Sequence, residues 1–184
     1  TGILLLLPVM LTGCAAKEPE TGKKISVYYV NNAETKVEMH DQYLNTGTPE
    51  EQLDEVMKLL STTPEKLEYK APFDMGFQVR DYEEEDGKLM IDVDKAYSEL
   101  SPTTEVLVRA AIVRTLTQLS NVKYVVITVE GGQLYDNSGE LVGWMSADQF
   151  INNDGNEINT YELVKVKLYF ANADGDKLIA AYRE

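Results

Sequence analysis

The sequence predicts an α+β fold in which two helices pack on one face of a small, mostly antiparallel sheet, in the order β-β-α-β-β-α-β. Runs of β-branched and aromatic residues at 25–30 and 122–129 have the composition and length of strands. Two amphipathic segments, at 49–60 and 102–119, each follow a hydroxyl residue and begin with Pro, which is typical of helix starts. An Asp-Gly pair at 86–87 lies between two further extended segments and indicates a hairpin.

The predicted fold begins with a pair of strands. Residues 25–30 read Ile-Ser-Val-Tyr-Tyr-Val, and the sequence Asn-Asn-Ala-Glu at 31–34 indicates a turn after them. A second extended segment follows at 36–43. His40 lies in this second strand beside Asp41, and we expect its side chain at the surface.

The first helix is predicted from its start signal and its apolar spacing. Thr48 is the expected N-cap, Pro49 takes the first helical position and Glu51 completes a capping box. Apolar residues then recur at spacings of three and four, which places on one helix face Leu53, Val56, Met57 and Leu60.

The second hairpin carries the densest acidic cluster of the chain. Residues 76–84 look extended, Asp86-Gly87 forms the turn and 88–93 is the returning strand. The acidic side chains are those of Glu83, Glu84, Glu85, Asp86, Asp92 and Asp94. Two carboxyl groups about 5 to 10 Å apart across a cleft could hydrolyse a glycoside. We favour a solvated hairpin tip, because a two-residue turn offers no enclosing walls that would raise a carboxyl pKa.

The second helix begins at Ser101-Pro102 and is predicted to be well buried, because its apolar stripe is broad. The stripe consists of Val106, Leu107, Ala110, Ala111, Val113, Leu116 and Leu119. A dense β-branched strand at 122–129 follows and ends at a Gly-Gly pair. Beyond it, Trp144-Met145 are expected to cover the end of the core, and 146–150 to form a helical turn.

The N-terminal residues are typical of a bacterial lipoprotein precursor. Residues 3–11 are an apolar run with the length of a signal-peptide h-region, too short to span a bilayer. The tetrapeptide Leu-Thr-Gly-Cys at 11–14 resembles a lipobox, whose cysteine becomes the lipidated first residue of the mature protein. The alternative is a secretory signal with an incidental cysteine. We expect a signal peptide without its n-region at 1–13, lipid attachment at Cys14 and a flexible tether over 14–24.

Composition limits the classes of function. Seventeen Lys and Arg against 31 Asp and Glu give a formal charge of −14, which disfavours nucleic-acid binding and charge-driven docking on anionic lipid. One Cys excludes an internal disulfide and a cysteine-rich zinc site, and one His leaves little material for a Ser-His-Asp triad. We therefore expect no catalytic, cofactor-binding or metal-binding residues and no small-molecule substrate.

Two weaker signals have ordinary explanations. Asp/Asn-Gly turns such as 136–139 and 172–176 could suggest calcium, but the latter places its Gly too early for an EF-hand and lacks the distal Glu. Turn chemistry accounts for both segments. Eleven tyrosines could be stacking platforms for cell-wall glycans, yet Tyr in a strand more often packs one ring face and exposes its hydroxyl.

A strand-turn-strand pattern recurs near the C-terminus. Residues 166–178 echo 26–37, with a Tyr, an Asn-Ala pair and, after a one-residue gap, a Lys followed by an apolar residue at matching places. Two hairpins can resemble each other by chance. We predict instead that 165–184 are the opening hairpin of a second, truncated copy of the domain, after a linker at 146–164.

Several segments together resemble the GerMN domain of sporulation and spore-germination lipoproteins. They are Leu-Met-Ile-Asp-Val-Asp at 89–94, the string at 112–122 that contains Thr-Leu-Thr-Gln, and Val-Val-Ile-Thr-Val-Glu-Gly at 125–131. The match extends over about 25–135, with the domain itself assigned to 25–145, and the segment at 168–176 resembles the start of a second copy.

The resemblance implies a lipid-anchored, non-enzymatic assembly or scaffold module, similar in shape to ring-building motifs of secretion-type channels. It would act on the outer face of the bacterial cytoplasmic membrane in sporulation or germination, through envelope protein partners or self-association. GerMN domains also occur outside spore formers. The alternative is a lipoprotein that binds cell-wall peptidoglycan through aromatic surface residues, and an extracytoplasmic hydrolase is the weakest hypothesis.

Overall fold

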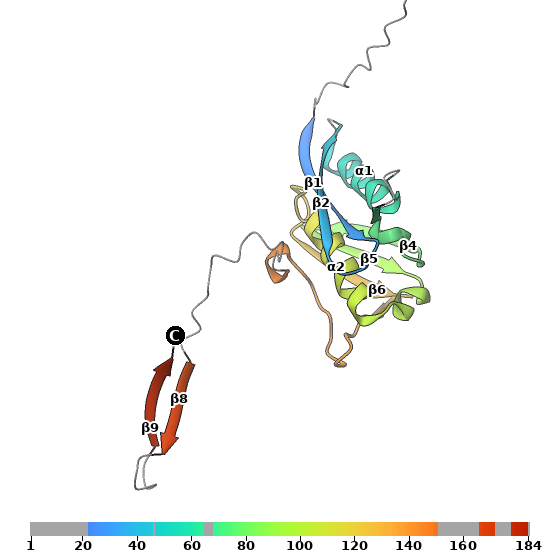
Figure 1. The fold of residues 1–184 in the computed structure, drawn as a ribbon. Coiled ribbons are helices and arrows are strands. Elements are labelled where there is room, and N and C mark those ends of the chain that lie inside the picture. Colours follow the sequence, from blue (N-terminus) through green and yellow to red (C-terminus); the bar gives the residue numbers. More distant parts are fainter. Residues whose placement is uncertain (1–21, 46, 65–67, 151–165, 172–177, 184) are drawn as a thin grey trace, which may run out of the picture. The chain divides into compact units, whose positions relative to one another are not determined.

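The computed structural model describes residues 22–45, 47–64, 68–150, 166–171 and 178–183 (Figure 1). The chain forms two compact units, residues 1–150 and 151–184. The first unit contains strands and helices in the order β1 (Lys23–Asn31), β2 (Val37–Leu44), α1 (Pro49–Ser61), β3 (Tyr69–Lys70), η1 (Pro72–Asp74), β4 (Val79–Glu85), β5 (Lys88–Val93), η2 (Lys95–Glu99), α2 (Pro102–Leu116), β6 (Tyr124–Val129), β7 (Gly132–Gln133) and η3 (Ala147–Gln149). The observed order contains the predicted elements β-β-α-β-β-α-β in sequence, together with two short strands, β3 and β7, that were not predicted.

The strands form two sheets where the sequence suggested one. The first has the order β2-β1-β3 and the second the order β4-β5-β6-β7. Every neighbouring pair is antiparallel except β5 and β6, which run parallel. The parallel pair arises because α2 crosses over between β5 and β6, as a connection between parallel neighbours requires. The predicted α+β fold class with mostly antiparallel strands is thus confirmed. The prediction of a single sheet was wrong, because the strands form two sheets.

Helix α1 forms for the reasons given by its sequence. Thr48 Oγ1 accepts a hydrogen bond from Glu51 N (3.2 Å), and Glu51 Oε2 accepts one from Thr48 N (2.9 Å), so both halves of the capping box are present. A cap of this kind contributes about 1 kcal/mol to stability. All four apolar residues predicted to face the core are buried: Leu53, Val56, Met57 and Leu60.

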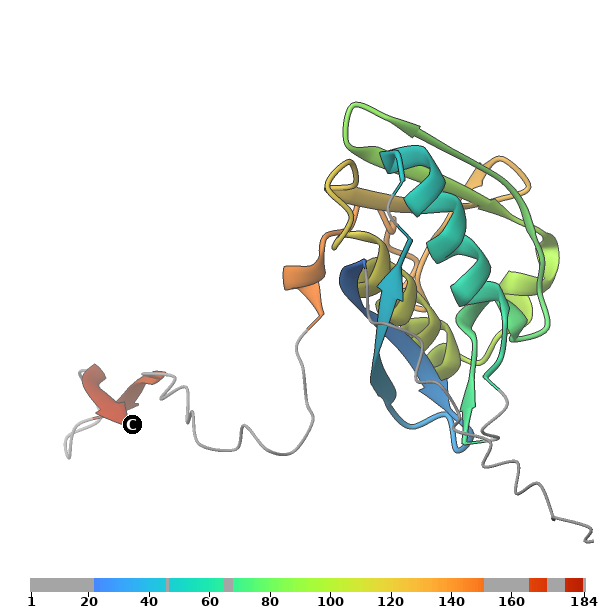
Figure 2. The same ribbon diagram turned by 90° about the horizontal axis from the view of Figure 1, so that it is seen from above.

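Helix α2 is buried nearly all round over its second half, as its broad stripe predicts, and it contacts both β1 and β6 (Figure 2). Ser101 Oγ caps it by accepting a hydrogen bond from Thr104 N (3.2 Å). The expected core position of Val106 was wrong, because its side chain is 44% exposed. Thr104 and Val108 are the buried residues of the first turns, and Val106 lies about 200° around the helix from Thr104.

Side chains of α2 and of the turn that follows it complete the hydrogen bonding of β1. Strand β3 pairs with β1 only at its end, so the rest of that edge faces the helix. Tyr28 N donates to Thr115 Oγ1 (3.0 Å). The side-chain amide of Gln118 makes the two hydrogen bonds to Ser26 that a neighbouring strand would make. Its Oε1 accepts from Ser26 N (2.9 Å) and its Nε2 donates to Ser26 O (2.7 Å). The Thr-Leu-Thr-Gln string therefore has a structural role, which is to satisfy the main chain of an open sheet edge.

The side chains of the sheets alternate between core and surface. On β5, Leu89 and Ile91 are fully buried while Met90 between them is exposed. The hairpin that leads into β5 turns at Asp86 (φ 53°) and Gly87 (φ 82°), the predicted two-residue turn. The helical turn predicted near 146–150 is also present as η3. One side of each sheet packs on the core, so the opposite side remains available for contacts.

The second unit contains an antiparallel hairpin of β8 (Val166–Ala171) and β9 (Leu178–Arg183). Its innermost pair, Ala171↔Leu178, encloses six residues, as does the innermost pair Val30↔Val37 of β1 and β2. That this hairpin opens a second copy of the domain stays a prediction.

Candidate functional site

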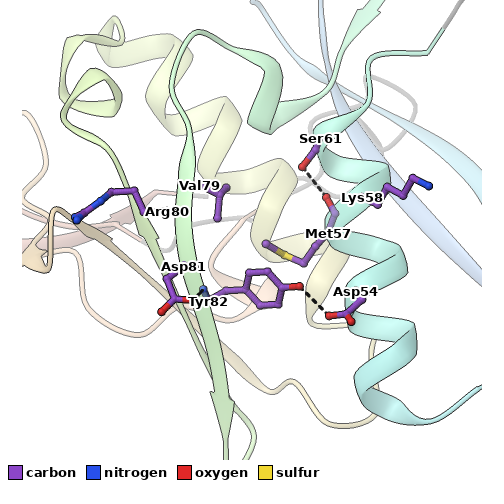
Figure 3. A pocket seen from close by; sticks show the side chains of 8 residues that line it. All are labelled: Asp54, Met57, Lys58, Ser61, Val79, Arg80, Asp81 and Tyr82. Atoms are coloured by element: carbon purple, nitrogen blue, oxygen red, sulfur yellow. Dashed lines mark hydrogen bonds between the residues drawn. The ribbon is translucent and has the colours of Figure 1, made fainter.

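A groove runs between helix α1 and strand β4 (Figure 3). Its volume is about 360 Å³, and it is lined by Asp54, Met57, Lys58, Ser61, Val79, Arg80, Asp81 and Tyr82. Strand β4 is the edge of the four-stranded sheet and has β5 as its one neighbour there. The groove therefore has a helix on one side and the edge of a sheet on the other.

The side chain of Tyr82 crosses this groove. Figure 3 shows it reaching from β4 to α1, where its hydroxyl donates a hydrogen bond to Asp54 Oδ1 (2.8 Å). That hydrogen bond, together with partial burial and the charges of Asp54 and Asp81, raises the pKa of Tyr82 above its ordinary value. The phenol stays neutral at physiological pH and ties the helix to the strand.

Apolar and charged groups are separated within the groove. Met57 is buried and points into the space between the two elements (Figure 3), where Val79 is half-buried. Asp81 Oδ1 accepts a hydrogen bond from Tyr82 N (2.9 Å). Arg80 lies at a register shift of β4 and pairs with Asp92 of β5 (Nη1–Oδ2 2.9 Å). The groove thus has apolar material at its base, and two carboxylates and two cationic side chains, Lys58 and Arg80, at its rim.

The outward side of the four-stranded sheet is a second exposed surface, which we call the open face. Three large side chains lie on it at 41–45% exposure: Met90, Tyr124 and Trp144. The register places Lys88 beside Tyr124 and Met90 beside Val126, and the bridge Val125↔Met145 places Trp144 along the same row. Strands with one solvated face normally carry polar residues there, so these apolar side chains make the open face a candidate interaction surface.

Charged side chains border the open face. Lys88 Nζ lies 5.7 Å from the centre of the Trp144 ring, a cation–π contact. On β4, Asp81, Glu83 and Glu85 stand opposite Asp92, Met90 and Lys88 in the antiparallel register. The open face is therefore apolar at its centre and acidic along the β4 side.

The acidic hairpin is a surface turn, as predicted, but two of its carboxylates have structural roles. Glu84 accepts hydrogen bonds from Gly87 N (2.9 Å) and from Asn121 Nδ2 (3.1 Å). Asp92 accepts from Thr128 Oγ1 (2.8 Å) and Gly131 N (2.7 Å), besides its ion pair.

The pKa of Asp92 reflects these hydrogen bonds and this ion pair. Burial by itself raises it, yet the hydrogen bonds from Gly131 and Thr128 and the charge of Arg80 outweigh burial, so the pKa lies below its ordinary value. Asp92 is therefore a charged acceptor that holds the β6–β7 turn on β5, which is a structural task.

The structure tests some sequence-derived residues and leaves others outside its range. Cys14 and the turn at 172–176 lie outside the described residues. His40 is not a free surface residue: it is half-buried, with ring centres of Tyr29 and Tyr69 at 5.7 and 4.5 Å. Of the pair expected to cover the core, Met145 does so and Trp144 is exposed.

Two absences apply to the part of the chain that the structure describes. Within it, no three His, Cys, Asp or Glu side chains are grouped so that they could hold a metal ion. No helix there is long and apolar enough to cross a membrane.

Sequence reasoning missed the open face and the groove. The alternation of Leu89, Ile91 and Val93 with the residues between them was a usable signal for the open face, because it places Met90 at an outward position. No local signal indicates the groove, because α1 and β4 are separated by 17 residues and two other elements.

Comparisons with known proteins agree with this architecture. A family model described as "Germane: Sporulation and spore germination" matches residues 26–135. The first GerMN domain of the sporulation protein GerM from Bacillus subtilis superposes with a TM-score of 0.53 at 14% identity, covering 70% of this chain and 99% of that one. At this identity the likeness shows the fold alone. None of the curated proteins matches the chain.

Two further solved structures are more distant. The tandem GerMN domains of Bacillus subtilis GerM give a TM-score of 0.48 at 21% identity, over 67% of this chain and 45% of that one. A candidate lipoprotein from Clostridium perfringens gives 0.46 at 17% identity, over 69% and 89%. The family match spans more than half of the chain, and the chain therefore belongs to the Germane family of sporulation and spore-germination domains.

Proposed function

We propose that this chain is a lipid-anchored, extracytoplasmic assembly module that acts in sporulation or germination by binding protein partners, without catalysis. The observation that carries the proposal is the open face. Covering each of its three large side chains would contribute about 1–2 kcal/mol, enough to drive association when combined with polar contacts. Membership of the Germane family supports the sporulation or germination context.

Four carboxylates of the domain take part in structural hydrogen bonds, which supports a role without catalysis. Asp54 accepts from Tyr82, and Glu84 and Asp92 accept from main-chain and side-chain donors. Glu34 accepts a hydrogen bond from Thr104 Oγ1 (2.6 Å) and pairs with Lys70 (2.8 Å), so it fastens the β1–β2 turn to α2 and β3. Each of these arrangements joins separate elements of the fold.

The open face favours a protein over a glycan as its ligand. Exposed Tyr124 and Trp144 could stack on sugar rings, which is the reason to consider peptidoglycan. However, Lys88 covers the Trp144 ring, and a sugar would have to displace it. Incubation of the chain with purified peptidoglycan, followed by sedimentation, should leave the protein in the supernatant. Co-sedimentation that Trp144→Ala abolishes would support the glycan hypothesis instead.

The anchor is part of the same proposal. Cys14 follows the lipobox-like residues, and two or more acyl chains would hold the domain stably on the outer face of the cytoplasmic membrane. In cells that make the full precursor, Cys14→Ser should move the protein from the membrane to the soluble fraction. A variant that stays as membrane-bound as its parent would refute the lipid anchor.

Co-purification tests the binding role. For the double variant Met90→Ala/Trp144→Ala, the amount of partner protein that co-purifies from native membranes should fall at least ten-fold. Val106→Ala removes an equally exposed apolar side chain from α2 and is the matched control. Equal recovery with all three chains would show that the open face does not bind a partner.

A further inference from the structure

We propose that the groove between α1 and β4 binds an extended, basic segment of a partner protein, which adds to the sheet as a strand beside β4. The inference rests on the proposed function in taking a protein as the ligand, but it concerns a different surface from the open face.

The edge of β4 supplies the main-chain groups that an added strand needs. In an antiparallel pair, alternate residues direct N–H and C=O away from the neighbouring strand. Tyr82 N donates to the Asp81 carboxylate rather than to β5, so the main chain of Tyr82 faces outward, and by alternation that of Glu84 does too. Regular pairing with β5 extends from Asp81 to Glu85, which gives the added strand a length of about five residues.

The groove gives the added strand a place for its side chains. Helix α1 faces β4 across the groove, which is the arrangement by which an edge strand and a helix together hold an extended peptide. Met57 and Val79 offer an apolar base for one side chain of the ligand. The volume of about 360 Å³ suits a short stretch of peptide.

The lining of the groove balances Asp54 and Asp81 against Lys58 and Arg80, and it is the acidic run along β4, beside which the added strand would lie, that favours a basic ligand. Residues 49–61 and 79–86 contain nine acidic and two basic side chains, so these 21 residues hold −7 of the chain's formal charge of −14. One of the two basic residues, Arg80, is already paired with Asp92. Lysine or arginine side chains of the ligand would meet this field within a Debye length, about 8 Å at physiological salt.

Tyr82 acts as a latch on the groove. Its hydroxyl occupies Asp54 Oδ1, and its ring spans the space that a ligand would enter. An ammonium or guanidinium group forms a stronger, charge-assisted hydrogen bond to a carboxylate than a phenol does. A basic side chain would therefore replace the Tyr82 hydroxyl as the hydrogen-bond donor to Asp54 and open the groove.

A second copy of this chain is a poorer occupant. Pairing two β4 edges would place the acidic residues of 81–86 opposite those of the other copy, and like charges in such cross-strand positions are destabilising. The overall charge of −14 adds to this repulsion. The ligand is therefore a segment of opposite charge from a different protein.

The test uses the full chain and an eight-residue peptide of alternating Val and Lys with blocked ends, measured by fluorescence anisotropy. A peptide of the same composition with its interior nitrogens methylated keeps the charge and loses the main-chain donors. We expect the first to bind at least ten-fold more tightly than the second. Equal binding of the two peptides would show that general charge attraction, and not strand addition, causes the binding. Binding of neither peptide would refute the site.

Variants of the latch sharpen the test. Tyr82→Phe should bind the alternating peptide three- to ten-fold more tightly, because Asp54 is freed, whereas Asp54→Asn should bind it three- to ten-fold more weakly. Tyr124→Phe, on the open face, is the matched control and should bind like the parent. If Tyr82→Phe leaves affinity unchanged, the latch is wrong. Co-purification through the open face is measured separately, so a failure here does not decide the proposed function.

Discussion

The two sheets of the domain differ in how their exposed parts are satisfied. In the three-stranded sheet, Thr115 of α2 and Gln118 of the turn after it complete the open edge of β1. The charges of the hairpin pair internally, as in Lys24–Asp41 (2.7 Å) and Lys36–Glu38 (2.6 Å). The four-stranded sheet keeps an acidic edge strand, a groove beside it and an apolar open face. The chain thus satisfies the β1 edge of the first sheet itself, whereas the second sheet carries the two surfaces that we propose for partners.

Inward and outward residues of β5 should respond very differently to truncation. Ile91 is fully buried and Met90 beside it is exposed. Ile91→Ala should lower the free energy of unfolding by about 3 kcal/mol, since it leaves a cavity, whereas Met90→Ala should change it by less than about 0.5 kcal/mol. Urea unfolding followed by circular dichroism measures both. A Met90→Ala loss comparable with that of Ile91→Ala would show that the open face is part of the core.

The contact that closes the first sheet should be the next most costly to remove. Thr115→Val keeps the volume but leaves the Tyr28 N–H without its acceptor, so it should cost about 1–3 kcal/mol. Thr103→Val, at an exposed position of the same helix, is the control and should have little effect. Equal stabilities for the two variants would mean that α2 does not satisfy β1 in this way.

Asp92 should make stability depend on pH. Its pKa is depressed in the folded state, so its contribution is present above the unfolded-state value of about 4 and is lost as the pH falls through the folded-state value. Asp92→Asn should therefore melt at a lower temperature than the parent at pH 7, and the difference should shrink below about pH 4. A difference in melting temperature that is constant from pH 7 to pH 2 would contradict the assignment.

The smallest effect is expected from the C-terminal unit. A two-stranded hairpin is marginal by itself in water, and it belongs to a separate compact unit. Deleting residues 160–184 should leave a cooperatively melting domain whose melting temperature falls by only a few degrees, about 1 kcal/mol or less. An unfolded truncated chain would instead make the hairpin an integral part of the first unit.

Local signals predicted the elements well. The capping box at Thr48 and Glu51 and the turn at Asp86-Gly87 depend on residues a few positions apart, and both are present in the structure. Val106 shows the limit of periodicity, because a helix that is apolar on most sides gives no unique inward face.

Long-range arrangement could not be predicted from the same signals. The division into two sheets and the parallel pairing of β5 with β6 depend on where α2 packs. The groove depends on α1 lying beside β4, and neither segment has a sequence feature that predicts its contact with the other. The open face and the groove therefore follow from the assembly of the sheets and not from any single segment of the sequence.

The central claim is that the four-stranded sheet, and not the three-stranded one, binds a partner. A photo-crosslinking amino acid placed at Trp144 samples the open face, and one placed at Met39, which is 55% exposed on β2, samples the other sheet. On native membranes, position 144 should give a discrete crosslinked protein band and position 39 should give none. The same band from both positions, or a band from position 39 alone, would contradict the account.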